Sequence, residues 1–212
     1  MTPKLYMNEI SPSVRAVLLT ARLLEVTLDL KEVDLMNKEQ LTPNFLKLNP
    51  QHTVPTLEEN GFVIWDSHAI MAYLVGKYGK SDNLYPKDIQ KRAIIDQRLH
   101  FESSIVSGFT RNILNPMLYD NQKIEIDEAS FNKTYSLIED FLSSNDWIAG
   151  PTMTIADLSL IPSITSLDCV VPIDYRKYPR IRYWVKRAES LPCYAANENG
   201  LNKIKGLISR NN

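Results

Sequence analysis

The sequence has little cysteine and no long apolar run, and each absence excludes a kind of protein. Its two cysteines, Cys169 and Cys193, have no close pair spacing and no companion ligands, so neither a disulfide framework nor a cysteine-based metal site is expected. No window approaches the roughly 18 continuous apolar residues of a membrane span, and the N-terminal segment lacks the apolar core of a targeting peptide. We therefore expect a cytoplasmic protein without a metal or a membrane contact, in which both cysteines are free thiols.

The chain also lacks an excess of charge of either sign. Lysine and arginine together number 24, aspartate and glutamate 25, and the formal net charge is −1. Binding to nucleic acid or to an anionic membrane normally requires a basic surplus, so neither partner is favoured. What the chain does contain is 44% apolar residues in a length of 212. That is enough to bury a core in one large domain or in two small ones.

Residues 1–79 alternate between strand patterns and helix patterns. Alternation of apolar and polar residues indicates strands, and apolar spacing of three and four indicates helices. The pattern predicts strand 4–7, helix 14–24, strand 27–32, helix 43–48, strands 56–58 and 62–65 around an Asn60-Gly61 turn, and a closing helix after Ser67.

Residues 88–212 read as helix almost throughout, after a polar segment at 80–87 that contains Pro86 and indicates a linker. Apolar residues recur at spacings of three, four or seven from Ile95 to Met117, which is typical of one buried face of a long helix. Further helices are predicted over 127–142, from Thr154 onward, over 179–190 and over 195–208.

The helix that starts at Thr154 carries both a start signal and an interruption. Thr154, with Asp157 three residues further on, forms a variant of the capping box in which aspartate replaces the commoner glutamate or glutamine. Pro162 falls where this helix should continue, and proline both removes a helix hydrogen bond and crowds the preceding turn. We therefore predict that the helix kinks or ends early at Pro162.

Two neighbouring segments together indicate a site for a peptide-like ligand. The Val54-Pro55 bond lies between a polar loop and an apolar strand and invites a cis peptide, which would leave the Val54 backbone free to pair with another backbone. Asp66 and Ser67 precede an apolar helical run, so they should lie at a helix N-terminus, whose free N–H groups suit a carboxylate. Each segment alone fits an ordinary turn or cap, whereas the combination is far less common.

A small mixed domain that holds the Val54-Pro55 turn, joined to an all-helical domain with the Thr154–Asp157 cap, resembles the cytosolic glutathione transferases. The resemblance rests on residues 11–17, 46–57 and 66–70. These segments are similar to those of the insect delta and epsilon classes, and epsilon is the better match. It covers essentially the whole chain. It implies an N-terminal thioredoxin-like domain of βαβαββα order at 1–79, the linker at 80–87, and an all-helical C-terminal domain at 88–212.

The resemblance also implies an activity. A glutathione transferase joins the thiolate of glutathione to electrophilic, mostly apolar small molecules, as in the detoxification of xenobiotics. Glutathione is then the cosubstrate, no metal is needed, and the enzyme is a homodimer. His68 would lie near the two-fold axis rather than act mainly as a ligand, with Met71, Ala72 and the helix from Asp88 adding to the interface.

Ser11 is the candidate catalytic residue, because the glutathione thiol must be held as a thiolate. Ser11 follows the first strand and precedes Pro12 at the first helical position, so its hydroxyl and the free helix amides can point at one sulfur. A serine hydroxyl cannot act as the base, but it can donate a hydrogen bond to the sulfur anion. The plain alternative is that Ser11 only caps the helix. Tyr6 is a rival for the catalytic role, and Ser13 a weaker one.

For glutathione itself, the resemblance implies that the Val54 backbone pairs with the cysteinyl unit, that Asp66 and Ser67 hold the γ-glutamyl end, and that His52 contacts the glycyl end. Asp66 is one methylene shorter than the glutamate usual in these classes, so its contact can become water-mediated. Gln40 stands where the epsilon pattern often has histidine, which would weaken binding. The implied glutathione set is Gln40, His52, Thr53, Val54, Pro55, Asp66, Ser67, His68 and Arg111.

The resemblance also implies an electrophile pocket by position, and the alternative for each of its residues is helix packing. Arg111 falls on the polar side of the long helix and fits either solvent or the active cleft. Ser107 and Thr110 would make the pocket more polar than is common in the class. The implied pocket residues are Met36, Ser107, Thr110, Leu114 and Leu118.

Two other functions fit the same pattern. One is a non-catalytic protein that sequesters apolar ligands or steroids. The other is a dedicated glutathione-dependent isomerase or peroxidase, for example in steroid hormone synthesis. A pure interaction module is disfavoured, because Ser11, the Val54-Pro55 loop and Asp66-Ser67 are all present.

Overall fold

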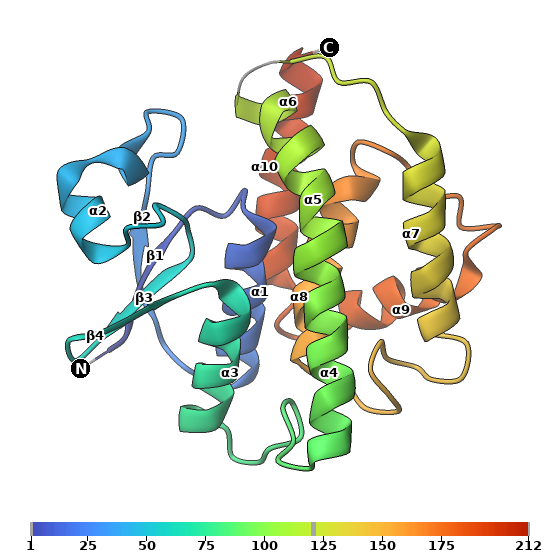
Figure 1. The fold of residues 1–212 in the computed structure, drawn as a ribbon, viewed down its shortest axis with the longest axis horizontal. Helices are drawn as coiled ribbons and strands as arrows, with labels where there is room; N and C mark the ends of the chain where they lie inside the picture. Colours follow the sequence, from blue (N-terminus) through green and yellow to red (C-terminus); the bar gives the residue numbers. More distant parts are fainter. Residues whose placement is uncertain (1, 120–121, 212) are drawn as a thin grey trace.

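The computed structural model describes residues 2–119 and 122–211, and it confirms the predicted fold class (Figure 1). Four strands form a sheet in the order β2-β1-β3-β4, with β1 parallel to β2 and antiparallel to β3, and β3 antiparallel to β4. The order of elements is the βαβαββα of a thioredoxin-like domain. Its elements are β1 (Lys4–Met7), α1 (Pro12–Leu23), β2 (Asp29–Glu32), α2 (Pro43–Leu48), β3 (Thr56–Glu59), β4 (Phe62–Trp65) and α3 (Ser67–Tyr78).

The central strand β1 places the N-terminus of α1 at the junction of the two halves. Leu5 of β1 lies opposite Leu30 and Leu57 in the register of the sheet, and Leu5 and Leu57 are fully buried. Helices α1 and α3 lie between the sheet and the helical half of the chain (Figure 1). Because α1 is buried between its two neighbours, the residues at its N-terminus are held in place by both halves.

The predicted long helix exists, but it is interrupted twice by wider turns. α4 (Ile89–Phe101) is followed by π-helical turns at Glu102–Val106 and Thr110–Leu114, which alternate with α5 (Ser107–Phe109) and α6 (Asn115–Tyr119). The four segments after α4 continue it as one green rod in Figure 1. Each π turn accommodates an extra residue, and such turns are frequent at functional sites. The faces of the rod therefore rotate relative to those of a regular helix.

α8 (Ile155–Asp168) is buried between helices of both halves, among them α1, α3 and α4. Thr154 caps α8 with the predicted capping box, in which Asp157 accepts hydrogen bonds from the Thr154 and Ile148 amides and from Trp184 Nε1 at 2.9, 2.7 and 2.9 Å. Of the two alternatives predicted at Pro162, a kink or an early end, the early end was wrong, since α8 continues to Asp168. Every residue from Ile155 to Leu167 is buried, and this packing outweighs the single hydrogen bond that the proline removes. The other helices of the C-terminal half are α7 (Glu128–Phe141), α9 (Pro179–Glu189) and α10 (Ala195–Asn211).

The two halves share one hydrophobic core. Arg15 of α1 is fully buried and donates to Asn197 Oδ1 at 2.7 Å and to Ser166, both in the helical half.

α3 ends at Tyr78 and α4 begins at Ile89, with neither helix nor strand between them. Cys169 and Cys193 are free. Among the described residues, none of the helices has the length and apolarity that crossing a membrane requires.

Candidate active site

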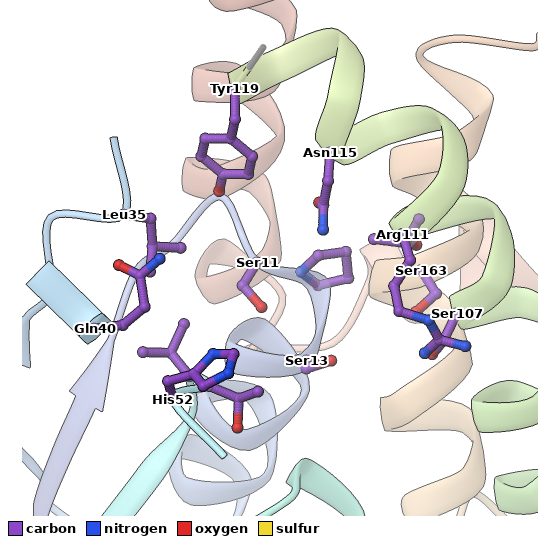
Figure 2. A pocket seen from close by; sticks show the side chains of 14 residues that line it. Ser11, Ser13, Leu35, Gln40, His52, Ser107, Arg111, Asn115, Tyr119 and Ser163 are labelled. Atoms are coloured by element: carbon purple, nitrogen blue, oxygen red, sulfur yellow. The ribbon is translucent and has the colours of Figure 1, made fainter. Parts of the chain in front are cut away.

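A cavity of about 250 Å³ opens where the N-terminus of α1, the loop before β3 and the α4–α6 rod meet (Figure 2). A second cavity of about 190 Å³ adjoins it and extends to the N-terminus of α3. The two share Ser13, Thr53, Val54, Ser107 and Arg111 in their walls. Together they form one continuous cleft, lined by both halves of the chain.

Ser11 lies in the wall of the first cavity and also caps α1. Its Oγ accepts a hydrogen bond from the Val14 amide at 3.4 Å, and Pro12 takes the first helical position. Figure 2 shows the Ser11 hydroxyl directed towards the middle of the cavity. The long cap bond uses only a lone pair of the oxygen, so the hydroxyl proton is left for an acceptor in the cavity. The capping and catalytic interpretations of Ser11 are therefore compatible.

The two rivals of Ser11 are placed differently. The Tyr6 hydroxyl donates to Glu58 Oε2 at 2.9 Å, and Tyr6 lines neither cavity. Burial and the bond to Glu58 raise the pKa of Tyr6. Ser13 lines both cavities, so it remains a neighbour of any ligand bound there.

The loop before β3 forms the wall opposite the rod. The Val54-Pro55 peptide is cis, and the loop is pinned by Asn49, whose Nδ2 donates to the Thr53 carbonyl at 3.0 Å and to Thr56 Oγ1 at 2.9 Å. His52, Thr53 and Val54 line the first cavity. The loop thus borders the cleft while a buried asparagine holds its shape.

The N-terminus of α3 closes the second cavity. Asp66 has a φ of 75° and caps α3, its Oδ1 accepting from the His68 and Ala69 amides at 2.9 and 3.1 Å. Oδ2 of Asp66 has no hydrogen-bond partner within the described part of the chain. Ser67 is buried at the first helical position. A ligand amine or carboxylate in this cavity would meet one free carboxylate oxygen and the end of a helix.

His68 is tied to a buried carboxylate that the sequence analysis did not single out. Its Nε2 lies 2.7 Å from Ser159 Oγ and 3.3 Å from Glu102 Oε2. Glu102 also accepts from Ser107 and Ser163 at 2.9 and 2.7 Å. Its place between Leu99 and Val106 on the buried face of the rod, where spacing predicts an apolar residue, was the signal that could have identified it.

The cleft residues supplied by the helical half differ in part from the electrophile pocket that the resemblance implies. Ser107, Thr110 and Arg111 line the first cavity. Leu114 and Leu118 do not: they are 1% and 4% exposed and pack with Ile204 of α10. Met36 is 54% exposed and lies outside the lining, which its neighbour Leu35 joins instead. The cavity also receives Asn115, Tyr119 and Ser163, which the sequence analysis missed.

The π turn at Thr110–Leu114 explains this change of face. A regular helix would bring positions 114 and 118 to the side of Ser107 and Thr110. One extra residue in the turn moves that side on by one position, so Asn115 and Tyr119 face the cavity instead. Nothing in the residue pattern marks the extra residue.

Two polar atoms at the cleft are buried without a partner in the described residues, Gln40 Oε1 on the turn Glu39–Leu41 and Thr110 Oγ1. No group of three or more histidine, cysteine, aspartate or glutamate side chains in residues 2–119 and 122–211 could hold a metal ion. A ligand with hydrogen-bond donors could satisfy both atoms.

Comparison with known families decides between the functions. Residues 10–76 match the family described as glutathione S-transferase, N-terminal domain, and residues 101–192 match glutathione S-transferase, C-terminal domain. The sequence is 40% identical over 214 residues to Glutathione S-transferase 1 of Manduca sexta, covering 99% of this chain and 98% of that protein. The chain belongs to the glutathione S-transferase family.

Solved glutathione S-transferase structures agree with this assignment. Glutathione Transferase E6 from Drosophila melanogaster superposes with a TM-score of 0.95 at 47% identity, covering 99% of this chain and 97% of that one. An epsilon-class enzyme from the housefly Musca domestica gives 0.95 at 46% identity, covering 99% and 98%. A glutathione transferase homolog of Drosophila mojavensis, solved with bound glutathione, gives 0.94 at 46% identity, covering 99% and 97%. The epsilon-like resemblance is confirmed.

As a glutathione S-transferase, the protein is an enzyme that uses glutathione and conjugates it to electrophilic small molecules. The comparisons give no support to a purely sequestering protein or to a dedicated isomerase or peroxidase. The glutathione S-transferase fold and activity are thus established, and the roles of single residues in the cleft are the next question.

Proposed function

We propose that this glutathione S-transferase binds glutathione across the two adjoining cavities, with the sulfur beside Ser11 and the γ-glutamyl end at Asp66 and Ser67. The observation that carries the proposal is the continuity of the cleft: Ser11, the cis Val54-Pro55 loop and the N-terminus of α3 all border it. The Val54 backbone then pairs with the cysteinyl unit. His52, Gln40 and Arg111 take the glycyl end, with Thr53 and Pro55 completing the wall.

In this proposal the protein's main chemical task is to keep the sulfur charged. An ordinary thiol titrates near ~8.5, and lowering that value by two units requires about 2.7 kcal/mol of preferential stabilisation of the anion. The Ser11 hydroxyl donates to the sulfur, and the free amides at the N-terminus of α1 add partial positive charge. The thiolate then attacks the electrophilic carbon, which either loses a leaving group or adds the sulfur across an activated double bond.

The two halves divide this work. Residues 1–79 hold glutathione, and residues 88–212 supply Ser107, Thr110 and Arg111 to the electrophile. We place the enzyme in the cytoplasm as a homodimer; the free thiols Cys169 and Cys193 suit a reducing compartment. Met71, expected at the dimer interface, is 0% exposed within the single chain and cannot contribute to it. Exposed apolar side chains such as Phe62 of β4 and Ile94 of α4 are available instead.

The test combines binding with turnover. Wild-type protein should bind immobilised glutathione and turn over a chlorodinitrobenzene-type substrate, and the ultraviolet absorbance of bound thiolate should titrate well below the free thiol. Ser11→Ala should bind glutathione but lose about 10²–10³ in kcat, as removal of one anion-stabilising donor does. Ser13→Ala is the matched control, because Ser13 lies in the same cleft two residues away.

Equal losses in Ser11→Ala and Ser13→Ala would refute the role of Ser11. Bound glutathione that titrates like the free tripeptide in the wild type would refute the whole thiolate proposal. Binding without turnover of any electrophile would support the sequestering function instead.

A further inference from the structure

The segment from Asp174 to Ser190, which contains α9, concentrates positive charge that the chain as a whole lacks. It holds six of the 24 lysines and arginines but two of the 25 aspartates and glutamates, a surplus of four positive charges in a chain whose net charge is −1. The balanced total, from which no membrane contact was expected, conceals this surplus. The six cations are Arg176, Lys177, Arg180, Arg182, Lys186 and Arg187.

The fold turns these cations towards solvent. Ile181, Trp184, Val185 and Ala188 form the buried face of α9, so the residues between them lie on the opposite face. Of the six cations only Arg187 is partly buried, and the other five are exposed. Figure 1 shows α7 and α9 on the far side of the rod from the sheet, and none of the six cations lines either cavity of the cleft. A partner on this face would therefore leave the cleft open.

Three of the cations are held by contacts within the protein. The guanidinium of Arg180 lies 3.4 Å from Glu139 Oε1, and that of Arg187 lies 2.6 Å from Asp146 Oδ1. Lys177 Nζ donates to a side-chain amide oxygen of α7 at 3.0 Å. These partners belong to α7 and the loop after it, so part of the charge on this side is already compensated.

The other three cations, Arg176, Arg182 and Lys186, are uncompensated. Their side chains make no hydrogen bond or ion pair with any residue in the ranges 2–119 and 122–211. Lys186 follows Arg182 by four positions and Tyr183 by three, so these side chains are neighbours on the helix surface. Tyr183 is 65% exposed. The outer face of α9 therefore presents free positive charge around one exposed amphipathic ring.

We propose that this outer face of α9, with the turn before it, is a docking surface for the anionic headgroups of a membrane, to which the enzyme binds reversibly. Clusters of about four to eight lysines and arginines on a helix are typical of proteins that bind anionic lipid surfaces. Tyrosine favours the headgroup level, because its ring is apolar and its hydroxyl is polar. Since the apolar side of α9 is buried in the protein core, the helix does not insert, and the contact is mainly electrostatic.

The character of the face favours a lipid surface over an acidic protein or a nucleic acid. Those partners are recognised through pockets, grooves or bidentate contacts that hold side chains in place. An anionic bilayer requires only cations that reach its plane, as the exposed and unpaired Arg176, Arg182 and Lys186 can. Apolar molecules partition into bilayers, so docking brings the enzyme to a place where apolar electrophiles accumulate. This inference goes beyond the proposed function and does not depend on it.

The experiment measures binding of the enzyme to lipid vesicles by sedimentation. Wild-type protein should bind phosphatidylcholine vesicles that contain about 30% phosphatidylserine and should not bind phosphatidylcholine alone. Binding should disappear as the salt concentration rises from about 0.05 M to about 0.5 M. Each cation removed should lower the partition coefficient by about fivefold. The combined variant Arg176→Gln, Arg182→Gln and Lys186→Gln should therefore lose about 10²-fold.

The matched control removes the same charge elsewhere. It combines Lys91→Gln, Lys123→Gln and Lys205→Gln, at three exposed positions outside α9. Its partition coefficient should fall by less than about threefold, because salt screens charges that lie more than a Debye length from the bilayer. Both combined variants should turn over a water-soluble chlorodinitrobenzene-type substrate like the wild type, since none of the six positions lines the cleft.

Each outcome decides the proposal. A loss confined to the α9 variant, with wild-type binding that requires phosphatidylserine and low salt, supports it. Equal losses in the two combined variants, equal binding to both kinds of vesicle, or no binding of the wild type to anionic vesicles would overturn it. Binding of RNA or polyglutamate without binding to anionic vesicles would also overturn it and would assign the face to another polyanion. Turnover of the soluble substrate tests the proposed function separately.

Discussion

His68 Nε2 lies 3.3 Å from Glu102 Oε2, so the first turn of α3 is joined to the start of the π turn in the helical rod. Glu102 is 4% exposed and also accepts from Ser107 and Ser163, both in the walls of the cleft. The same imidazole bonds Ser159 of α8. The His68 imidazole thereby links the wall of the cleft that the N-terminal half forms to the wall that the helical half forms.

His68→Ala should lower the free energy of unfolding by about 1–3 kcal/mol, because it leaves buried polar groups less well satisfied. The measurement is urea denaturation at neutral pH. His100→Ala is the control, since His100 is exposed on α4 and its ring makes no hydrogen bond within the described residues. Equal effects of the two variants would show that the bond of His68 to Glu102 contributes nothing.

Asp157→Ala should be among the most destabilising single changes. Asp157 accepts from the Ile148 and Thr154 amides and from Trp184 Nε1, and its removal strands three buried donors at about 1–3 kcal/mol each. Asp127→Ala, which removes the exposed cap of α7, should cost only about 1 kcal/mol. Denaturation midpoints of the two variants measure the difference, and similar midpoints would contradict it.

Two glycines of α10 should respond to alanine in opposite directions. A Cβ at Gly200 would overlap the carbonyl oxygen of Glu9 and the side chain of the buried Arg15, so Gly200→Ala should destabilise by about 1–3 kcal/mol. A Cβ at Gly206 meets nothing within 4 Å, so Gly206→Ala should be neutral or stabilise by up to about 1 kcal/mol. Thermal unfolding of both variants gives the comparison. A Gly200→Ala protein as stable as Gly206→Ala would mean that α10 shifts without cost.

Glu59 should make stability depend on pH in the acid range. Burial alone would raise the pKa of Glu59, but hydrogen bonds from Lys77, Tyr78 and Tyr73 outweigh it and lower that pKa below its ordinary value. Since the folded-state pKa is the lower one, the stabilisation is complete above the unfolded-state value and is lost as the pH falls through the folded-state value. Unfolding free energies measured from about pH 7 to about pH 3 should fall less in Glu59→Gln than in the wild type. Glu125→Gln, at an exposed position, should keep the wild-type slope.

Gln40→His should tighten glutathione binding. The Gln40 amide oxygen is buried at the cleft without a partner in the described chain, and a protonated imidazole there would add positive charge for the glycyl carboxylate. Because histidine titrates near ~6.5, the gain in affinity should be several-fold at about pH 6 and smaller at about pH 8. Calorimetric titration with glutathione measures it, and Gln90→His on the exposed start of α4 is the control. An equal gain at both pH values would exclude the charge as its cause.

Much of the fold was predictable because the deciding signals are local. The Asn60-Gly61 turn, Pro12 at the start of α1, and the Thr154–Asp157 capping box each act through neighbouring residues. The Val54-Pro55 bond is cis, as the loop pattern suggested. In the wall of the cleft that residues 1–79 form, the same local segments place the candidate residues together, because each segment sits at the end of a predicted strand or helix.

The wall of the cleft that the helical half forms was less predictable, because its geometry depends on packing over long distances. Regular helix spacing puts Leu114 and Leu118 beside Thr110, whereas the π turn brings Asn115 and Tyr119 there. Nothing in the apolar spacing signals the added residue of a π turn.

By itself, the sequence determined the order of strands and helices, the helix caps, and the N-terminal segments that line the cleft, since these follow from hydrogen bonds and steric limits within a few residues. Only the tertiary structure decided that α8 continues through Pro162, that Glu102 lies buried against His68, and which face of the rod meets the cleft. Those outcomes depend on contacts between residues far apart in the chain, where burial of a whole helix outweighs the preference of a single residue.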